Sequence, residues 1–221
     1  MIIKIKLSES IQGFWAVPLS GYGHTADEQP MPYLENEGIA LTPRFGGEEN
    51  KTESNNESLP LPKGKLKTKW PLAQRIFNLF RRRINIYWRN VFKTHTRIDK
   101  QFLFIEQLNY QEIKNGFKGE CPLVTFVRTF EIEETVLIVK DIITFKKNVE
   151  FTEFEYAMTP ILRCNAKKTT HIDSDVDVEQ NHVYPIQSST GLAEMKSKKL
   201  ENTIFKKGQL LEVRFRYKVS Q

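Results

Sequence analysis

Cysteine is scarce in this sequence, and long apolar runs are missing. Only two cysteines occur among 221 residues, Cys121 and Cys164, which excludes a disulfide scaffold and a four-cysteine zinc site. Free cysteine is among the most buried residue types, so we expect two buried thiols, with one disulfide as the alternative. No run of about 18 apolar residues occurs, so we expect neither a membrane-spanning helix nor a signal peptide. The compartment stays open.

Recognisable catalytic and cofactor motifs are also lacking. No P-loop, G-x-S-x-G, H-E-x-x-H or Cys-x-x-Cys pattern occurs in the sequence. Gly21, Gly23 and Ala26 match the G-x-G-x-x-A pattern of dinucleotide-binding turns. Prolines on both sides leave no room for the helix that this pattern requires. We therefore expect no cofactor.

One acidic run supplies the only candidate metal ligands. Its four carboxylates stand at alternate positions, so an extended chain would project them from one face, where Ca²⁺ or a basic partner would relieve their repulsion. Val178 stands where an EF-hand loop needs glycine, which rules that site out. We expect a solvated loop or a charged edge strand rather than a metal site. The four residues are Asp173, Asp175, Asp177 and Glu179.

Apolar and aromatic side chains, in contrast, are plentiful. Hydrophobic residues make up 39% of the chain, and 15 Phe, 7 Tyr and 3 Trp supply large side chains for a core. This composition excludes a chain that is disordered throughout. The length fits one large domain or two small ones.

Positive charge is concentrated in one segment of a chain whose net charge is +6. Residues 1–62 carry 4 basic and 9 acidic groups, and residues 101–221 carry 17 of each. Residues 63–100 carry 12 basic groups and 1 acidic group. We therefore divide the chain into an acidic, partly irregular N-terminal region, a basic linker or amphipathic segment, and a C-terminal domain, with boundaries at these residues.

The segment before and within the basic region predicts little sheet structure. Residues 46–58 have no apolar side chain and precede a Pro-rich stretch, so we expect a loop or linker over residues 46–69. Pro71 suits the start of a short helix that continues to about Leu79. From Arg82 onward, helical and strand periods fit equally well.

The last hundred residues predict strands. Polar and apolar residues alternate over 126–132, β-branched residues dominate 135–145, and further alternating runs cover 149–158 and 211–219. Turn-forming residues separate these runs, which is typical of an antiparallel meander. Because so many one-sided strands must bury a face, we predict a mainly β protein with an antiparallel β-sandwich.

The basic segment has the composition of a polyanion-binding site. Its cations would neutralise sulfate, phosphate or uronate groups, and its aromatic faces would stack on sugars or bases. Nucleic acid and an anionic membrane surface are the alternative partners. The competing interpretation is that the aromatics are core and the charges a solvated face. The candidate binding residues are Arg75, Arg81, Arg82, Arg83, Arg89, Trp70 and Trp88.

Residues 127–145 carry one family resemblance. Arg128 lies on a strand that leads into a second strand containing Asp141, and this segment resembles the hairpin of the carboxy-terminal β-sandwich of heparinase II/III-like polysaccharide lyases. The resemblance implies a β-sandwich associated with acidic polysaccharide, and it covers about a hundred residues.

The same resemblance implies a division of labour between chains. Such lyases place their chemistry between an α-helical toroid and the sandwich, and this sequence has no segment long enough for a toroid. The sequence therefore looks like the sandwich part, which we expect to be inactive alone and to have a separate toroid chain as a partner. If it is active, the resemblance implies a lyase that acts on uronate-containing glycans. His24, with Asp27 and Tyr22 nearby, is the local acid/base candidate, and a surface histidine in a turn is the alternative.

Overall fold

The chain folds into antiparallel sheets. The computed structural model describes residues 2–6, 8–17, 29–43, 60–67, 109–120, 123–134, 136–163, 170–186 and 191–219. Every regular element in these ranges is a strand, and none is a helix, which confirms the predicted mainly antiparallel β fold. The strands are β1 (Ile2–Lys6), β2 (Ile11–Ala16), β3 (Gln29–Asn36), β4 (Ile39–Ala40), β5 (Lys63–Leu66), β6 (Asn109–Ile113), β7 (Gly116–Glu120), β8 (Val124–Glu133), β9 (Val136–Phe145), β10 (Val149–Arg163), β11 (Thr170–Ser174), β12 (Glu179–Ile186), β13 (Gly191–Phe205) and β14 (Leu210–Val219).

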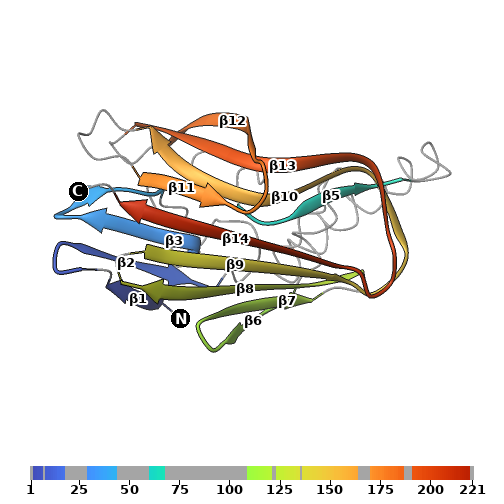
Figure 1. The fold of residues 1–221 in the computed structure, drawn as a ribbon, viewed down its shortest axis with the longest axis horizontal. Coiled ribbons are helices and arrows are strands. Elements are labelled where there is room, and N and C mark those ends of the chain that lie inside the picture. Colours follow the sequence, from blue (N-terminus) through green and yellow to red (C-terminus); the bar gives the residue numbers. More distant parts are fainter. Residues whose placement is uncertain are drawn as a thin grey trace, which may run out of the picture.

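These strands form three sheets (Figure 1). Sheet A has the order β1-β2-β3-β4, sheet B the order β12-β13-β10-β5, and sheet C the order β11-β14-β9-β8-β7-β6. The chain crosses between sheets C and B four times: from β9 to β10, from β10 to β11, from β11 to β12 and from β13 to β14. The β9–β10 and β13–β14 connections are short and lie at the same end of the molecule.

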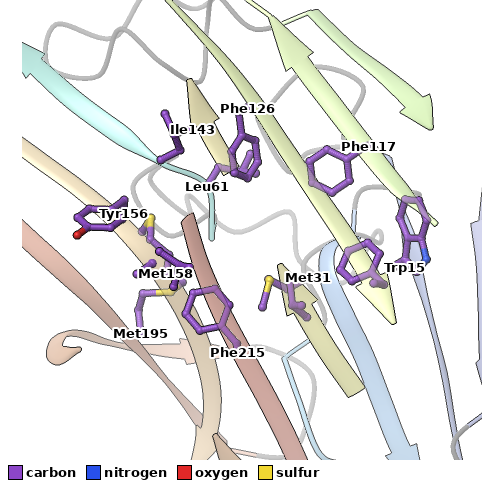
Figure 2. Close-up of a cluster of buried hydrophobic side chains, with 14 of the residues drawn as sticks. Trp15, Met31, Leu61, Phe117, Phe126, Ile143, Tyr156, Met158, Met195 and Phe215 are labelled. Carbon is purple, nitrogen blue, oxygen red and sulfur yellow. The ribbon is translucent and has the colours of Figure 1, made fainter. Parts of the chain in front are cut away.

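A core of aromatic side chains lies between sheets B and C. Phe145 of β9 stacks on Phe205 of β13, with ring centroids 4.0 Å apart and planes 6° from parallel. Phe154 of β10 meets both rings edge-on, and all three side chains are buried. Contacts of this kind between inner faces are typical of a β-sandwich, and Figure 2 shows the cluster continuing to Phe215 and Met195.

The predicted alternation holds in β14 and in most of β8, and β9 alternates as well, but β8 and β10 each depart from it at one place. On β14, Val213, Phe215 and Tyr217 are buried, whereas Glu212, Arg214 and Lys218 are exposed. Ile132 continues the alternating series of Phe126 and Phe130, but it is 47% exposed, and the last three residues of β8 are all exposed. On β10, the pairing with β5 shifts between Phe151 and Glu153. Phe151 and Phe154 are therefore both buried, whereas strict alternation from Phe154 would bury Thr152 in place of Phe151.

Most of the N-terminal residues that the structure describes form strands. Residues 2–40 contribute all four strands of sheet A, and Trp15 of β2 packs on Phe130 of β8 with ring centroids 4.7 Å apart. The β3–β4 turn places Glu37 and Gly38 at positive φ, which glycine adopts without strain. The sequence did contain a signal for β1, because Ile3 and Ile5 alternate with exposed lysines.

One strand contradicts the predicted loop over residues 46–69. β5 occupies Lys63–Leu66 and pairs antiparallel with β10 at the edge of sheet B. Gly64 lies against two rings of β10, because a Cβ there would stand 2.7 Å from Phe151 and 3.0 Å from Phe154. The start of the basic segment is therefore part of the sandwich. The division of the chain into three regions stays a prediction.

Candidate functional site

The residues that carry the family resemblance meet in the middle of sheet C. Arg128 on β8 lies between Phe117 on β7 and Asp141 on β9 in the strand register. Its Nε donates to Asp141 Oδ1 at 2.6 Å, and its Nη2 donates to Asp141 Oδ2 at 2.7 Å. The predicted hairpin therefore folds back as expected, and its two charged residues form a bidentate pair.

This ion pair is buried and holds distant segments of the chain. Arg128 has 0% and Asp141 has 2% of its surface exposed. The Nη1 of Arg128 donates to the carbonyl oxygens of Pro30 at 2.9 Å and Pro60 at 2.8 Å. One guanidinium thus links β8 to β9, to β3 of sheet A, and to the segment that leads into β5.

Aromatic rings complete the surroundings of the guanidinium. Its Cζ lies 5.3 Å from the ring centroid of Phe126 and 5.9 Å from that of Phe117, within the range of cation–π attraction. Tyr217 of β14 is buried in the same part of the core, and its hydroxyl makes no hydrogen bond with any described residue. Burial raises the pKa of Tyr217 well above its ordinary value; the charge of Arg128 opposes this shift and that of Asp141 adds to it.

The burial of Arg128 decides what this cluster can do. A guanidinium with no exposed surface cannot contact a polysaccharide, and its hydrogen bonds go to the protein itself. We conclude that Arg128 and Asp141 are structural residues that join sheet A and the β5 segment to sheet C.

A second buried cation lies on β5. Lys63 Nζ stands 3.1 Å from Glu155 Oε2 on β10, and the exposed fractions of the two side chains are 2% and 13%. The other oxygen of Glu155 accepts a hydrogen bond from the hydroxyl of Ser197 on β13. Although Lys63 belongs to the basic segment, it is not available to a polyanion, because its charge is taken up inside sheet B. Lys67, directly after β5, is exposed and pairs with Glu150.

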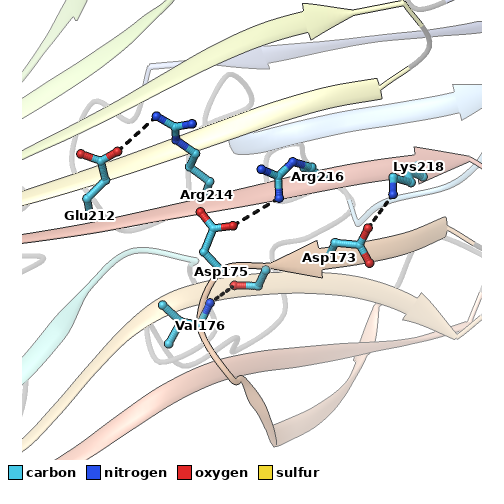
Figure 3. A network of polar contacts seen from close by, with 8 residues as sticks. Asp173, Asp175, Val176, Glu212, Arg214, Arg216 and Lys218 are labelled. Atoms are coloured by element: carbon cyan, nitrogen blue, oxygen red, sulfur yellow. Dashed lines mark hydrogen bonds and ion pairs between the residues drawn. The ribbon is translucent and has the colours of Figure 1, made fainter.

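The acidic run divides between a strand and a bend, so its carboxylates do not share one extended face. β11 ends at Ser174, whose hydroxyl accepts a hydrogen bond from Val176 N. Asp173 pairs with Lys218 at 2.7 Å and Asp175 pairs with Arg216 at 3.2 Å, both across to β14 (Figure 3). Asp177 lies between β11 and β12 and is exposed.

Glu179 begins β12, which belongs to the other sheet. Within the described ranges, no three His, Cys, Asp or Glu side chains are grouped so that they could hold a metal ion. Of the four carboxylates, Asp173 lies on β11 at the edge of sheet C, and Asp173 and Asp175 pair with basic residues of β14.

The remaining predicted site residues lie outside the described residues. These are His24 and Tyr22 with Asp27, both cysteines, and the candidate polyanion-binding set Trp70, Arg75, Arg81, Arg82, Arg83, Trp88 and Arg89. Their roles, and the predicted helix after Pro71, stay predictions.

No protein-family model matches the sequence, and neither does any curated protein. Across the described residues, no helix is long and apolar enough to cross a membrane.

The two buried ion pairs are the features that sequence reasoning missed. Arg128 and Asp141 each occupy an inward position on an otherwise apolar strand face, and this was the available signal. A charged residue at such a position needs an opposite charge close by, and the hairpin supplies one. Lys63 gave no comparable signal, because its partner lies far along the chain on β10.

Proposed function

We propose that this chain is a glycan-associated β-sandwich domain that binds acidic polysaccharide. The proposal is carried by the resemblance of residues 127–145, and the antiparallel pairing of β8 with β9 is compatible with the hairpin that this resemblance implies. The sandwich-like packing of sheets B and C agrees with the domain type that the resemblance implies.

The charge distribution supports an anionic partner. Residues 63–100 carry a large excess of positive charge, and cations neutralise the sulfate and carboxylate groups of acidic glycans. Arg81, Arg82 and Arg83 are three consecutive cations in this segment, and aromatic residues lie on either side of them in the sequence.

Retention on immobilised heparin tests the proposal. We expect the full chain to be retained, and the triple variant Arg81→Ala, Arg82→Ala, Arg83→Ala to elute at much lower salt. A matched variant removes three exposed lysines elsewhere, Lys4, Lys6 and Lys114, and should elute with the wild type. Unchanged retention of the arginine variant would contradict the proposal.

Two further measurements separate this function from its alternatives. A nucleic-acid or membrane-surface protein would bind DNA or anionic vesicles more tightly than acidic glycans when the three are compared at several salt concentrations. A complete lyase would release unsaturated uronate products that absorb in the ultraviolet. From the chain alone we expect no such product on a panel of acidic glycans, because the resemblance places part of the active site on a toroid.

A further inference from the structure

Four lysines gather where sheets B and C are joined. Lys146 and Lys147 lie between β9 and β10, and Lys206 and Lys207 lie between β13 and β14. We call these four residues the lysine tip. Figure 1 shows both connections at the same end of the molecule.

Hydrogen bonds fix the two connections to each other. Lys207 N donates to Asn148 Oδ1 at 2.8 Å, and Gly208 N donates to Phe145 O at 2.7 Å. Phe145 N in turn donates to Gln209 O at 3.0 Å. Directly beneath, the stacked rings of Phe145 and Phe205 anchor the connections in the core. The lysines therefore project from a rigid base, which lowers the entropy lost when a ligand binds.

Two carboxylates beside the tip leave most of its charge uncompensated. Glu120 pairs with Lys118 and also with Lys146 of the tip, at 3.5 Å, and Glu150 pairs with Lys67. Hydrogen bonding from Lys118, together with the charges of Lys118 and Lys146, lowers the pKa of Glu120. Lys146 is thus the lysine of the tip that has a carboxylate partner among the described residues.

The other three lysines of the tip keep their charge available. Lys147, Lys206 and Lys207 are exposed, and none forms an ion pair with a described residue. Their ammonium groups therefore remain free to meet an anion from solution.

Two amide side chains add hydrogen-bond donors to the same surface. Asn148 uses its carbonyl oxygen to accept from Lys207 N, and Gln209 uses its own to accept from Lys206 N at 3.0 Å. An amide has donors only at its nitrogen, so the NH₂ ends remain for solvent or ligand. The tip thus combines ammonium and amide donors, the combination that carboxylate and sulfate oxygens accept.

We propose that the lysine tip, with Asn148 and Gln209, is a binding surface for the anionic groups of an acidic polysaccharide. This inference rests on the proposed function and assigns it a second surface, separate from the arginines of residues 63–100. Membrane insertion is disfavoured, because the nearby exposed aliphatic residues Ile204 and Leu210 lie on β13 and β14, in different sheets, rather than on one face. Base stacking lacks a platform, because the two connections contain no aromatic residue.

A triple variant with Lys147→Gln, Lys206→Gln and Lys207→Gln tests the surface. The probe is heparin, titrated against the full chain at about 0.15 M salt. We expect binding to weaken about tenfold, because each exposed charge contact contributes a factor of about two to three. The slope of log K against log salt should also fall by about two to three, as the lost cations release fewer counterions.

Substitutions of the amides test the same surface without removing a lysine. Asn148→Asp and Gln209→Glu keep the oxygen that accepts the backbone N–H but replace the outward NH₂ with a negative charge. We expect both variants to fold like the wild type by circular dichroism and to bind heparin several-fold more weakly. The control variant Lys4→Gln, Lys6→Gln, Lys114→Gln loses equal charge from exposed sites elsewhere and should bind like the wild type.

The possible outcomes separate the two proposals. If the wild type binds heparin and the tip variants bind as well as the control variant, the tip inference is overturned and the proposed function stands. If the wild type binds neither heparin nor polygalacturonate, both are overturned. If the tip substitutions weaken binding to DNA or to anionic vesicles but leave heparin binding unchanged, the assignment to polysaccharide is wrong.

Discussion

Replacing Arg128 by methionine should strongly destabilise the protein, although the two side chains have similar length. The substitution removes both hydrogen bonds to Asp141 and those to the carbonyls of Pro30 and Pro60. A carboxylate with 2% exposure is then left without a cation, which typically costs about 3–5 kcal/mol. Since native proteins have about 5–15 kcal/mol in total, this loss is a large share of the stability.

Urea unfolding followed by far-ultraviolet circular dichroism measures this loss. A loss of about 4 kcal/mol corresponds to a melting temperature lower by about 8–16 °C, because each kcal/mol shifts the melting temperature of a chain of this size by about 2–4 °C. The double variant Arg128→Met, Asp141→Leu should lose less than the sum of its single variants, because it leaves no unpaired charge. A loss below about 1 kcal/mol for Arg128→Met, or additive single variants, would refute the assignment of a structural ion pair.

The exposed ion pair between Lys218 and Asp173 is the matched control. Its side chains are 51% and 38% exposed, so water competes for both charges. Lys218→Met should change stability by less than about 1 kcal/mol in the same assay.

Three further predictions concern the described sheets. Tyr217→Phe should raise stability by about 1–3 kcal/mol in urea unfolding, since the buried hydroxyl has no partner among the described residues. Because folding raises the pKa of Tyr217, the wild type should also lose stability as the pH rises above about 10. If Tyr217 causes this loss, the stability of Tyr217→Phe should not fall in the same way. Gly116→Ala should lower stability by about 2–3 kcal/mol, because the new Cβ would stand 2.0 Å from a backbone carbonyl oxygen of β8. Gly208→Ala has nothing within 4 Å of its Cβ and should lower stability by about 1 kcal/mol, because its φ is positive. Equal losses of stability in the two variants would contradict this reasoning. The hydrogen bond from Lys140 lowers the pKa of Glu212, so an NMR titration should show it below its usual range and Lys140→Met should raise it.

Sequence reasoning was most successful where one face of a strand is apolar and the other wet. The sequence predicted strands at β8, β9 and β14, and the alternation in β14 also predicted its packed face, because alternation is a local property of the chain. It was less successful where a register shift intervenes, as between Phe151 and Glu153, because a bulge depends on the partner strand.

The failures at the N-terminal half share one physical cause. β5 follows a proline-rich stretch and contains two lysines, so its local sequence predicts a linker. Its place in the sheet depends on the distant residue Glu155 on β10, which pairs with Lys63. Sheet A likewise depends on contacts with distant residues, such as Trp15 with Phe130 and Pro30 with Arg128. Long-range partners of this kind cannot be read from local periodicity.

The candidate site was predictable only in part. The hairpin that brings Arg128 to Asp141 was predicted, but the burial of both charges was not. The lysine tip had no signal beyond two turn sequences, because Lys147 and Lys207 become neighbours only when β9–β10 and β13–β14 are set side by side.

The most direct test of acidic glycan binding compares two forms of one polymer. Calorimetric titration of the full chain with polygalacturonate, and with the same polymer after methyl esterification of its carboxylates, isolates the effect of negative charge. We expect binding to polygalacturonate that weakens with added salt, and no binding to the neutral ester. Equal affinity for both forms, or binding to neither, would contradict the account.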